Sequence, residues 1–318
     1  MRIHSGKNII FGKNQNIMKK ILLAVTCFIL SISLAAQENE KPEMYKVGKY
    51  EVYILTEGSG YGGTDILIDA PDSILEKYVP DGTFPIATNA VLVRDGDKAW
   101  LIDTGYGRRI FEKMAALGVE PEKVEHVLLT HMHGDHIGGM LRDGQKAFPN
   151  SSVVVSQREY DYWTGDDEMN KLPEGRRGNF MSARKVIEEY ENKLVIFDYK
   201  LIRGISESEL SEGLTMIGAY GHTPGHIMFM LKDGDEQLLI WGDLTHALAV
   251  QMPHPEISVT YDLDPDMARI SRLEVLEYVS ANKIAVTGMH LPAPKIGMVV
   301  KKEGSAGGYD FVPLDLRK

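Results

Sequence analysis

Short hydrophobic runs alternate along the chain with segments whose apolar residues have helical spacing. Residues 90–94 and 99–103 flank the tripeptide DGD, which predicts a β-hairpin. Residues 108–117 have helical spacing and are followed by Gly118, a typical helix end. The same patterns predict strands at residues 127–129, 152–155, 214–220, 226–231, 237–241 and 284–287, and helices at residues 179–193 and 266–282. Such a mixture of strands and helices predicts an α/β fold.

The hydrophobic pattern shows no domain boundary within residues 37–318. Residues 37–48 are polar, and we expect them to be frayed. Beyond them we find no low-complexity linker and no internal repeat. The sequence therefore predicts one domain over residues 37–318.

Residues 1–36 have a pattern of their own. Residues 18–36, MKKILLAVTCFILSISLAA, begin with two lysines, continue with an apolar run and end in small residues. This is typical of a secretory signal peptide that starts at Met18 and is cleaved after Ala35 or Ala36, so we expect an N-terminal extension and signal peptide and an exported protein, periplasmic or secreted. A membrane anchor is the alternative, but the apolar run is shorter than the ~20 residues of a spanning helix, so we expect no stable membrane insertion.

Composition narrows the chemistry. The chain has 318 residues, 43% of them hydrophobic, as in ordinary globular proteins. Its formal charge of −10 becomes −15 without residues 1–36, because these carry five Lys and Arg and no acid. That charge argues against nucleic acid as a partner. Cys27 is the one cysteine, so a disulfide framework and a cysteine-rich zinc site are excluded, and any metal site needs histidines and carboxylates.

Candidate metal ligands are densest at residues 130–139, THMHGDHIGG, directly after a predicted strand. His131 and His133 can face one way, while Asp135 and His136 turn another way. Two ligand sets suit two adjacent cations better than one. Further candidates follow other predicted strands: His222 in GHTPGH at residues 221–226, Asp243 in the pair GD, and His290. The ends of strands are where α/β folds place their working loops.

In this order, the HxHxDH run, the GHTPGH segment, the GD pair and the late histidine resemble the metallo-β-lactamase superfamily. The resemblance implies an αββα sandwich, in which two mixed sheets with flanking helices pack face to face and two divalent metal ions lie at one edge. It implies three groups of ligands: His131, His133 and His222 for one metal, Asp135, His136 and His290 for the other, and Asp243 for both. Such ligands suit zinc, which we expect, and also iron, manganese and cobalt.

A second set of residues resembles the branch of that superfamily that contains methyl parathion hydrolase, lactonases and arylesterases. It includes FPN at residues 148–150, Gln157, Glu159, Asp161, Trp163 and FVP at residues 311–313. This resemblance implies a hydrolase of an ester-like bond, but His246 and Met252 lie where the branch varies near its metals, so the substrate is not carried over from it. Together with the predicted signal peptide, we expect an exported enzyme acting on a small-molecule lactone or aryl ester, with phosphotriester cleavage as a side activity. A hydroxide that bridges the metals would be the nucleophile. Asp243 and Asp135 would be the catalytic carboxylates, and either Asp135 or water would protonate the leaving group. The sequence leaves the oligomeric state open, a homodimer included.

Other residues are expected to support the ligands or the substrate. We expect Asp103, Thr130 and Thr223 to hold the ligands by hydrogen bonds, Asp103 because it resembles the superfamily's supporting acid. We expect His226 to be structural and to bond a loop carbonyl. Asp262, Asp264 and Asp266 are expected to prepare a helix start at Pro265. The candidates for substrate contact are His246, Trp163, Phe180 and Met252. The alternative for His246 is a solvated side chain, and the alternative for the other three is packing in the core.

Four other functions compete with this one. A thioesterase of the glyoxalase II kind shares the seven ligands but normally binds a glutathione conjugate through basic residues. A true β-lactamase generally lacks the bridging aspartate, which Asp243 supplies here. A nuclease conflicts with the negative charge. A non-catalytic metal-binding module would be expected to have an incomplete ligand set.

Overall fold

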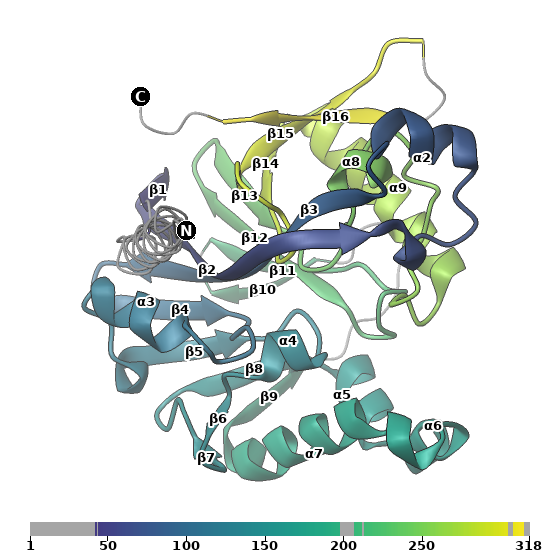
Figure 1. The fold of residues 1–318 in the computed structure, drawn as a ribbon. Coiled ribbons are helices and arrows are strands. Elements are labelled where there is room, and N and C mark those ends of the chain that lie inside the picture. Colours follow the sequence, from purple (N-terminus) through teal and green to yellow (C-terminus); the bar gives the residue numbers. More distant parts are fainter. Residues whose placement is uncertain (1–41, 43, 198–206, 212, 305–307, 315–318) are drawn as a thin grey trace, which may run out of the picture. The chain divides into compact units, whose positions relative to one another are not determined.

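The structure is a computed structural model that describes residues 42, 44–197, 207–211, 213–304 and 308–314. Two large mixed sheets organise these residues (Figure 1). The first sheet consists, in spatial order, of β1 (Met44–Val47), β2 (Tyr50–Gly63), β3 (Thr83–Asp95), β4 (Lys98–Ile102), β5 (Val124–Leu128), β8 (Ser152–Ser156) and β9 (Leu194–Phe197). The second consists of β10 (Glu207–Ser211), β11 (Leu214–Gly218), β12 (Ile227–Asp233), β13 (Glu236–Ile240), β14 (Ala285–Thr287), β15 (Gly297–Lys301) and β16 (Tyr309–Pro313).

Helices and short elements complete the fold. The helices are α2 (Asp72–Tyr78), α3 (Ile110–Ala116), α4 (Gly134–Ile137), α5 (Gln157–Thr164), α6 (Asp166–Lys171), α7 (Gly178–Tyr190), α8 (Leu248–Gln251) and α9 (Pro265–Asn282). Single 3₁₀ turns lie at Thr64–Ile66, Pro121–Lys123, Glu174–Arg176 and Glu191–Lys193, and the strands β6 (Leu141–Arg142) and β7 (Gln145–Lys146) form a small separate ribbon. None of the helices in the described ranges is long and apolar enough to cross a membrane.

The alternation of side chains along each strand builds a layered core. Val91 and Val93 of β3 pack with Phe229 of β12 in a central cluster that both sheets share. Leu92 faces the other way and packs with residues of α3 and α7. On the second sheet, Met228 turns outward to a cluster with residues of α9. The two sheets therefore pack face to face with helices outside, which confirms the predicted αββα class.

The predicted elements appear within a few residues of their expected bounds, except that β3 begins at Thr83, well before the predicted start at residue 90. The predicted hairpin is present, because β3 pairs antiparallel with β4 and Asp95 lies opposite Lys98. The expectation of frayed residues at 37–48 was wrong for β1, whose residues pair with β2 along its whole length. Polar residues are tolerated there because backbone hydrogen bonds to a neighbouring strand need no apolar side chain. The sequence patterns also missed several elements, among them β2, β9, β15, β16, α2, α5 and α6. The predicted signal peptide at residues 18–36 lies outside the described residues.

The topology brings the candidate ligands to one place. β4 runs parallel to β5 in the first sheet, and β13 runs parallel to β14 in the second. Asp103, Asp243 and His290 lie in the segments that follow β4, β13 and β14. The carboxyl ends of these strand pairs meet at one edge of the sandwich, where α4 also begins (Figure 1).

Candidate metal centre

The HxHxDH segment leaves β5 as a short loop and then becomes α4. His133 directly precedes the helix in extended backbone, and the helix runs from Gly134 to Ile137. Gly139 lies so close to the preceding loop that a Cβ there would be 2.5 Å from the carbonyl oxygen of Thr104. The double glycine after the histidines is therefore required by packing, and it lets α4 lie against the loop that carries Asp103.

Three histidines converge on one point. The Nε2 of His131 lies 3.0 Å from the Nδ1 of His133, and that Nδ1 lies 3.1 Å from the Nε2 of His222. Two of these side chains come from the loop after β5, and the third comes from the loop between β11 and β12. The three ring nitrogens form a group of the size that holds one metal ion.

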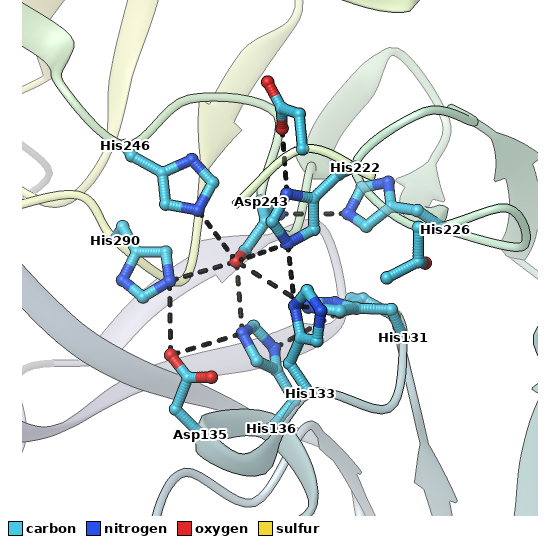
Figure 2. A network of polar contacts seen from close by, with 12 residues as sticks. His131, His133, Asp135, His136, His222, His226, Asp243, His246 and His290 are labelled. Atoms are coloured by element: carbon cyan, nitrogen blue, oxygen red, sulfur yellow. Dashed lines mark hydrogen bonds and ion pairs between the residues drawn. The ribbon is translucent and has the colours of Figure 1, made fainter. Parts of the chain in front are cut away.

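A second group lies beside the first. The Oδ2 of Asp135 lies 3.4 Å from the Nε2 of His290 and 3.7 Å from the Nε2 of His136. Asp243 lies between the two groups, as Figure 2 shows. One of its oxygens is 3.2 Å from the Nε2 of His222, and the other is 3.3 Å from the Nε2 of His136. The structure thus brings together all seven side chains that the resemblance implied.

Outer hydrogen bonds fix the direction of the ligand nitrogens. The Nδ1 of His136 contacts the Oδ2 of Asp103 at 2.7 Å. The Nδ1 of His290 contacts the carbonyl oxygen of Ala87 at 2.9 Å. A ring whose Nδ1–H donates outward presents the Nε2 lone pair to the centre, which is the arrangement of metal-binding histidines.

The polar atoms at the centre fit cations better than they fit one another. The Nε2 of His136 and the Oδ1 of Asp243 are buried and have no hydrogen-bond partner among the described residues. Burial alone would raise the pKa of Asp243, but the surrounding histidines hold that pKa well below its usual range. An ionised carboxylate among converging histidine nitrogens, which release their protons when a metal binds, is the donor set expected for two adjacent divalent ions.

Asp103 and Thr130 support the centre as expected. Asp103 adopts a left-handed backbone with φ of 57°, which an aspartate tolerates better than most residues. Its Oδ1 accepts the backbone N–H of Thr130 at 2.8 Å, and its Oδ2 accepts the hydroxyl of Thr130 at 2.7 Å. The same Oδ2 contacts His136, so one buried carboxylate fixes both the loop and a candidate ligand.

Thr223 acts less directly than its position beside His222 suggested. Its hydroxyl donates to the Oε2 of Glu159 at 2.6 Å. Glu159, on α5, also accepts the backbone N–H of Met132 at 2.8 Å and that of Gly225 at 3.1 Å. One buried carboxylate therefore ties the loop of His131 to the loop of His222. The sequence marked Glu159 only as part of a resemblance and missed this role.

The sequence also missed the role of Asp262. Its Oδ1 contacts the Nδ1 of His222 at 3.0 Å, and its Oδ2 lies 3.3 Å from the guanidinium of Arg272. The expectation that it prepares the start of a helix holds for Asp264, which caps α9 by accepting the backbone N–H of Met267. The sequence does show an aspartate two residues before the N-cap Asp264. A local pattern does not show, however, which of these acids turns toward the histidines.

His226 is structural, as expected. Its Nδ1–H donates to the carbonyl oxygen of Ala219 at 2.9 Å, and its Nε2 accepts the backbone N–H of Asp243 at 3.0 Å. Burial lowers the pKa of His226 to about 3, so its ring is neutral and keeps this tautomer. Both ring nitrogens are thus used in holding the backbone.

A cavity of about 740 Å³ opens beside the centre. Asp135, Asp243 and His290 lie in its wall, together with His246, whose Nε2 is 3.1 Å from the Oδ2 of Asp243. The expected substrate contact of His246 agrees with this position, and the alternative of a solvated side chain does not, because the residue is buried.

The other three expected substrate contacts were wrong. Trp163 and Phe180 are buried in the core between the first sheet and its helices, and their rings pack on each other with centroids 4.7 Å apart. Met252 is buried in the cluster on the outer face of the second sheet. None of the three is among the residues that line the cavity. The prediction failed because no local sequence pattern distinguishes a large apolar side chain in a cavity wall from one in a packed layer.

Comparison with known proteins agrees with the geometry. Residues 83–283, well over half of the chain, match the model of the metallo-beta-lactamase superfamily. The chain belongs to this superfamily. Among curated relatives of this superfamily member, an N-acyl homoserine lactonase of Bacillus sp. is 27% identical over 126 residues, 39% of each chain. The lactonase AttM of Azorhizobium caulinodans is 30% identical over 128 residues, 38% of this chain and 40% of the relative. The chain thus spans about two fifths of the length of these relatives.

Solved structures of similar fold cover more of the chain. The hydrolase AbOPH in the beta lactamase superfamily is 29% identical and aligns with a TM-score of 0.74 over 86% of this chain and 97% of its own. AidC, a dizinc quorum-quenching lactonase in complex with a product, aligns with a TM-score of 0.75 over 87% of this chain and 99% of its own, at 24% identity. Membership of the superfamily and these likenesses support a metal-dependent hydrolase.

Proposed function

We propose that this chain is a dinuclear metal-dependent hydrolase that cleaves a lactone or an aryl ester. The observation that carries the proposal is the convergence of two groups of donors on Asp243, at the floor of a cavity. The lactonases among the curated relatives and solved structures support the choice of a cyclic or activated ester. Phosphotriester cleavage is a side activity that such a site favours, since it also suits a phosphoryl oxygen.

We propose that the ligand set divides as the resemblance to the superfamily implies. His131, His133 and His222 would hold one ion, Asp135, His136 and His290 the other, and Asp243 both. We propose zinc for both ions, because imidazole and carboxylate donors suit it and because AidC is described as a dizinc enzyme. When bound, the two ions would supply an activated water and a Lewis acid for the scissile carbonyl.

The protein's own residues prepare and complete the reaction. Asp243 is held in place by the N–H contact to His226 and keeps the two donor groups together. Asp135 is partly exposed and lies in the cavity wall, where its carboxylate can accept a proton from the attacking water. The leaving group then takes a proton from Asp135 or from water. His246 in the same wall restricts how the substrate can approach Asp243.

The charges of the cavity favour a substrate that is neutral near its scissile bond. Asp65, Asp135 and Asp243 are among the lining residues, and none of the described lining residues is Lys or Arg. A β-lactam carries a carboxylate next to its ring, and a glutathione conjugate carries several charges, and beyond the donors that would hold the two ions this wall offers neither of them a Lys or Arg. A neutral lactone or aryl ester has no such need.

A panel assay tests the proposal. We expect the metal-loaded protein to hydrolyse lactones and aryl esters faster than thioesters, phosphotriesters and β-lactams. Metal analysis should give about two ions per chain. His131→Ala and Asp243→Ala should abolish turnover and lower the metal content. The proposal would be overturned if either variant still hydrolysed every ester, or if the wild type preferred a β-lactam to the esters.

Export is proposed separately. The pattern of residues 18–36 supports a signal peptide, and fractionation of cells that express the chain, with N-terminal sequencing of the product, tests it. A product that retains residues 18–36 in the cytoplasm would contradict it.

A further inference from the structure

A second, smaller groove adjoins the cavity at the metal centre. It has a volume of about 250 Å³ and shares Tyr61, Ile86, Thr88 and Tyr106 with the larger cavity. Shared wall residues make the two spaces neighbours along the ribbon of β2 and β3. A substrate whose reacting group lies at the metal centre can therefore extend into the groove.

The floor of this groove is a glycine-rich part of β2. Gly58 lies opposite Thr88, and Gly60 lies opposite Ile86. Residues directly opposite in an antiparallel pair project from the same face of the sheet, so side chains at these glycines would stand in the groove. The groove exists because both positions lack a side chain.

Nothing in the described fold requires glycine at these positions. Gly58 and Gly60 have no positive φ, and a Cβ built on either would meet no atom within 4 Å. A bulge in the pairing lies beside Gly58, but Gly60 is in regular register. Glycine weakens the interior of a strand, and it often marks a place where a ligand approaches the backbone. The glycine at position 60 is therefore best explained by a ligand that lies against the backbone there.

A cation lies in the wall of the groove. Arg108 is exposed, and its guanidinium lies over the ring of Tyr106 at 4.9 Å. It is the one Lys or Arg among the described residues that line either space. The carboxylate of Glu57, also in the groove wall, already accepts the backbone N–H groups of Tyr106, Arg109 and Ile110. The guanidinium edge is thus the site in this groove suited to a carboxylate.

We propose that the groove is a subsite for the tail of the substrate, an extended chain that crosses Gly60 and ends in a carboxylate at Arg108. The inference rests on the proposed function for the reacting end and adds the chemistry of the far end. It fits the charged side chains of both spaces, because no Lys or Arg lies beside the reacting end and the far end meets the guanidinium of Arg108.

Three p-nitrophenyl esters test the subsite: the acetate, the octanoate and the half-ester of octanedioic acid. The wild type should have a higher kcat/KM for the half-ester than for the octanoate. Arg108→Met should lower the ratio of these two values about tenfold, the loss expected for one charge-assisted contact. Arg142→Met is the matched control, because Arg142 also lies over an aromatic ring, that of Phe111, at 4.7 Å. The control should keep the wild-type ratio.

Gly60→Val tests the floor of the groove. Valine suits a strand and meets no neighbour here, so we expect a folded protein. The ratio of kcat/KM for the octanoate to that for the acetate should fall about tenfold, as expected when a side chain fills the path of the tail. An equal fall for both esters, or an unchanged ratio, would overturn the subsite.

A binding measurement separates this inference from the proposed function. The mono-N-methylamide of octanedioic acid is titrated into the full chain by calorimetry, and Arg108→Met should weaken its binding about tenfold relative to the wild type and to Arg142→Met. If the wild type hydrolyses no ester, the proposed function fails. The titration still tests whether the groove binds a carboxylate at Arg108. Equal affinity of all three proteins would overturn the subsite even if every ester is hydrolysed.

Discussion

At the scale of single residues, the centre depends on atoms that would not touch a metal. Asp103 and Asp262 each hold the Nδ1 of a candidate ligand, at 2.7 Å from His136 and 3.0 Å from His222. Such outer contacts orient the ring and raise its basicity, so the loss of one typically lowers metal affinity about 10–100-fold. Asp262 also forms an ion pair, because its other carboxylate oxygen faces the buried guanidinium of Arg272.

We therefore predict that Asp262→Ala weakens metal binding. His222 loses the acceptor that fixes its tautomer, and the expected loss of affinity is about 10–100-fold, measured by competition with a chromophoric chelator. Asp264→Ala is the control from the same loop. It removes the cap of α9 and should cost about 1 kcal/mol of stability in denaturant unfolding while metal affinity is kept. Equal metal loss in both variants would show that the loop, and not the contact to His222, matters.

At the scale of elements, α5 fastens the two loops that carry the first group of histidines. Its N-terminus packs directly on the GHTPGH loop, where a Cβ at Gly225 would clash with the backbone nitrogen of Glu159. The Oγ of Ser156 donates to the carbonyl oxygen of Gly225 at 2.6 Å and adds a second link. The relative position of His131 and His222 is thus set by a helix that contributes no candidate ligand.

We predict that Glu159→Gln destabilises the protein. The amide group would face donors that now point at a carboxylate oxygen, and each unsatisfied buried group costs roughly 1–3 kcal/mol. Denaturant unfolding should show a loss of roughly 2–5 kcal/mol. Glu188→Gln, an exposed change on α7, is the control and should leave the unfolding midpoint in place. Stability equal to the wild type in the Glu159 variant would contradict the fastening role.

At the scale of the whole molecule, metal binding and folding are coupled. The candidate ligands come from both sheets, from the loops after β5, β13 and β14 and from the loop between β11 and β12. Ions held there would join the two halves of the sandwich, and they bind the unfolded chain much more weakly. A ligand at 1,000 times its Kd stabilises the folded state by about 4 kcal/mol.

We predict that chelation lowers the melting temperature by roughly 10 °C and that added zinc restores it. Thermal unfolding followed by circular dichroism measures the shift. In Asp243→Ala the same chelator should have little effect, because the residue that joins the two groups is absent. A wild-type melting temperature that ignores the chelator would mean that the cluster does not hold ions in solution.

The sequence by itself determined an α/β fold and the densest group of candidate ligands, and its resemblance to the superfamily implied the αββα class and the full set of seven. Alternating apolar residues placed β3, β4 and the central strands, and the spacing of HxHxDH marked four ligands within one loop. Both signals are local, because side-chain direction repeats along a strand and neighbouring ligands in a loop share one short segment. The hairpin at β3 and β4 and the structural role of His226 were predicted for the same reason.

Only the tertiary structure decided which distant residues act together. Glu159 and Asp262 reach the histidines through contacts between segments far apart in the chain, and Trp163, Phe180 and Met252 turned out to be packed in the core. The groove over Gly60 exists only because β2 pairs with β3 beside the loop of Arg108. Cavities and outer hydrogen bonds arise from packing between elements, and no periodicity within one element encodes them.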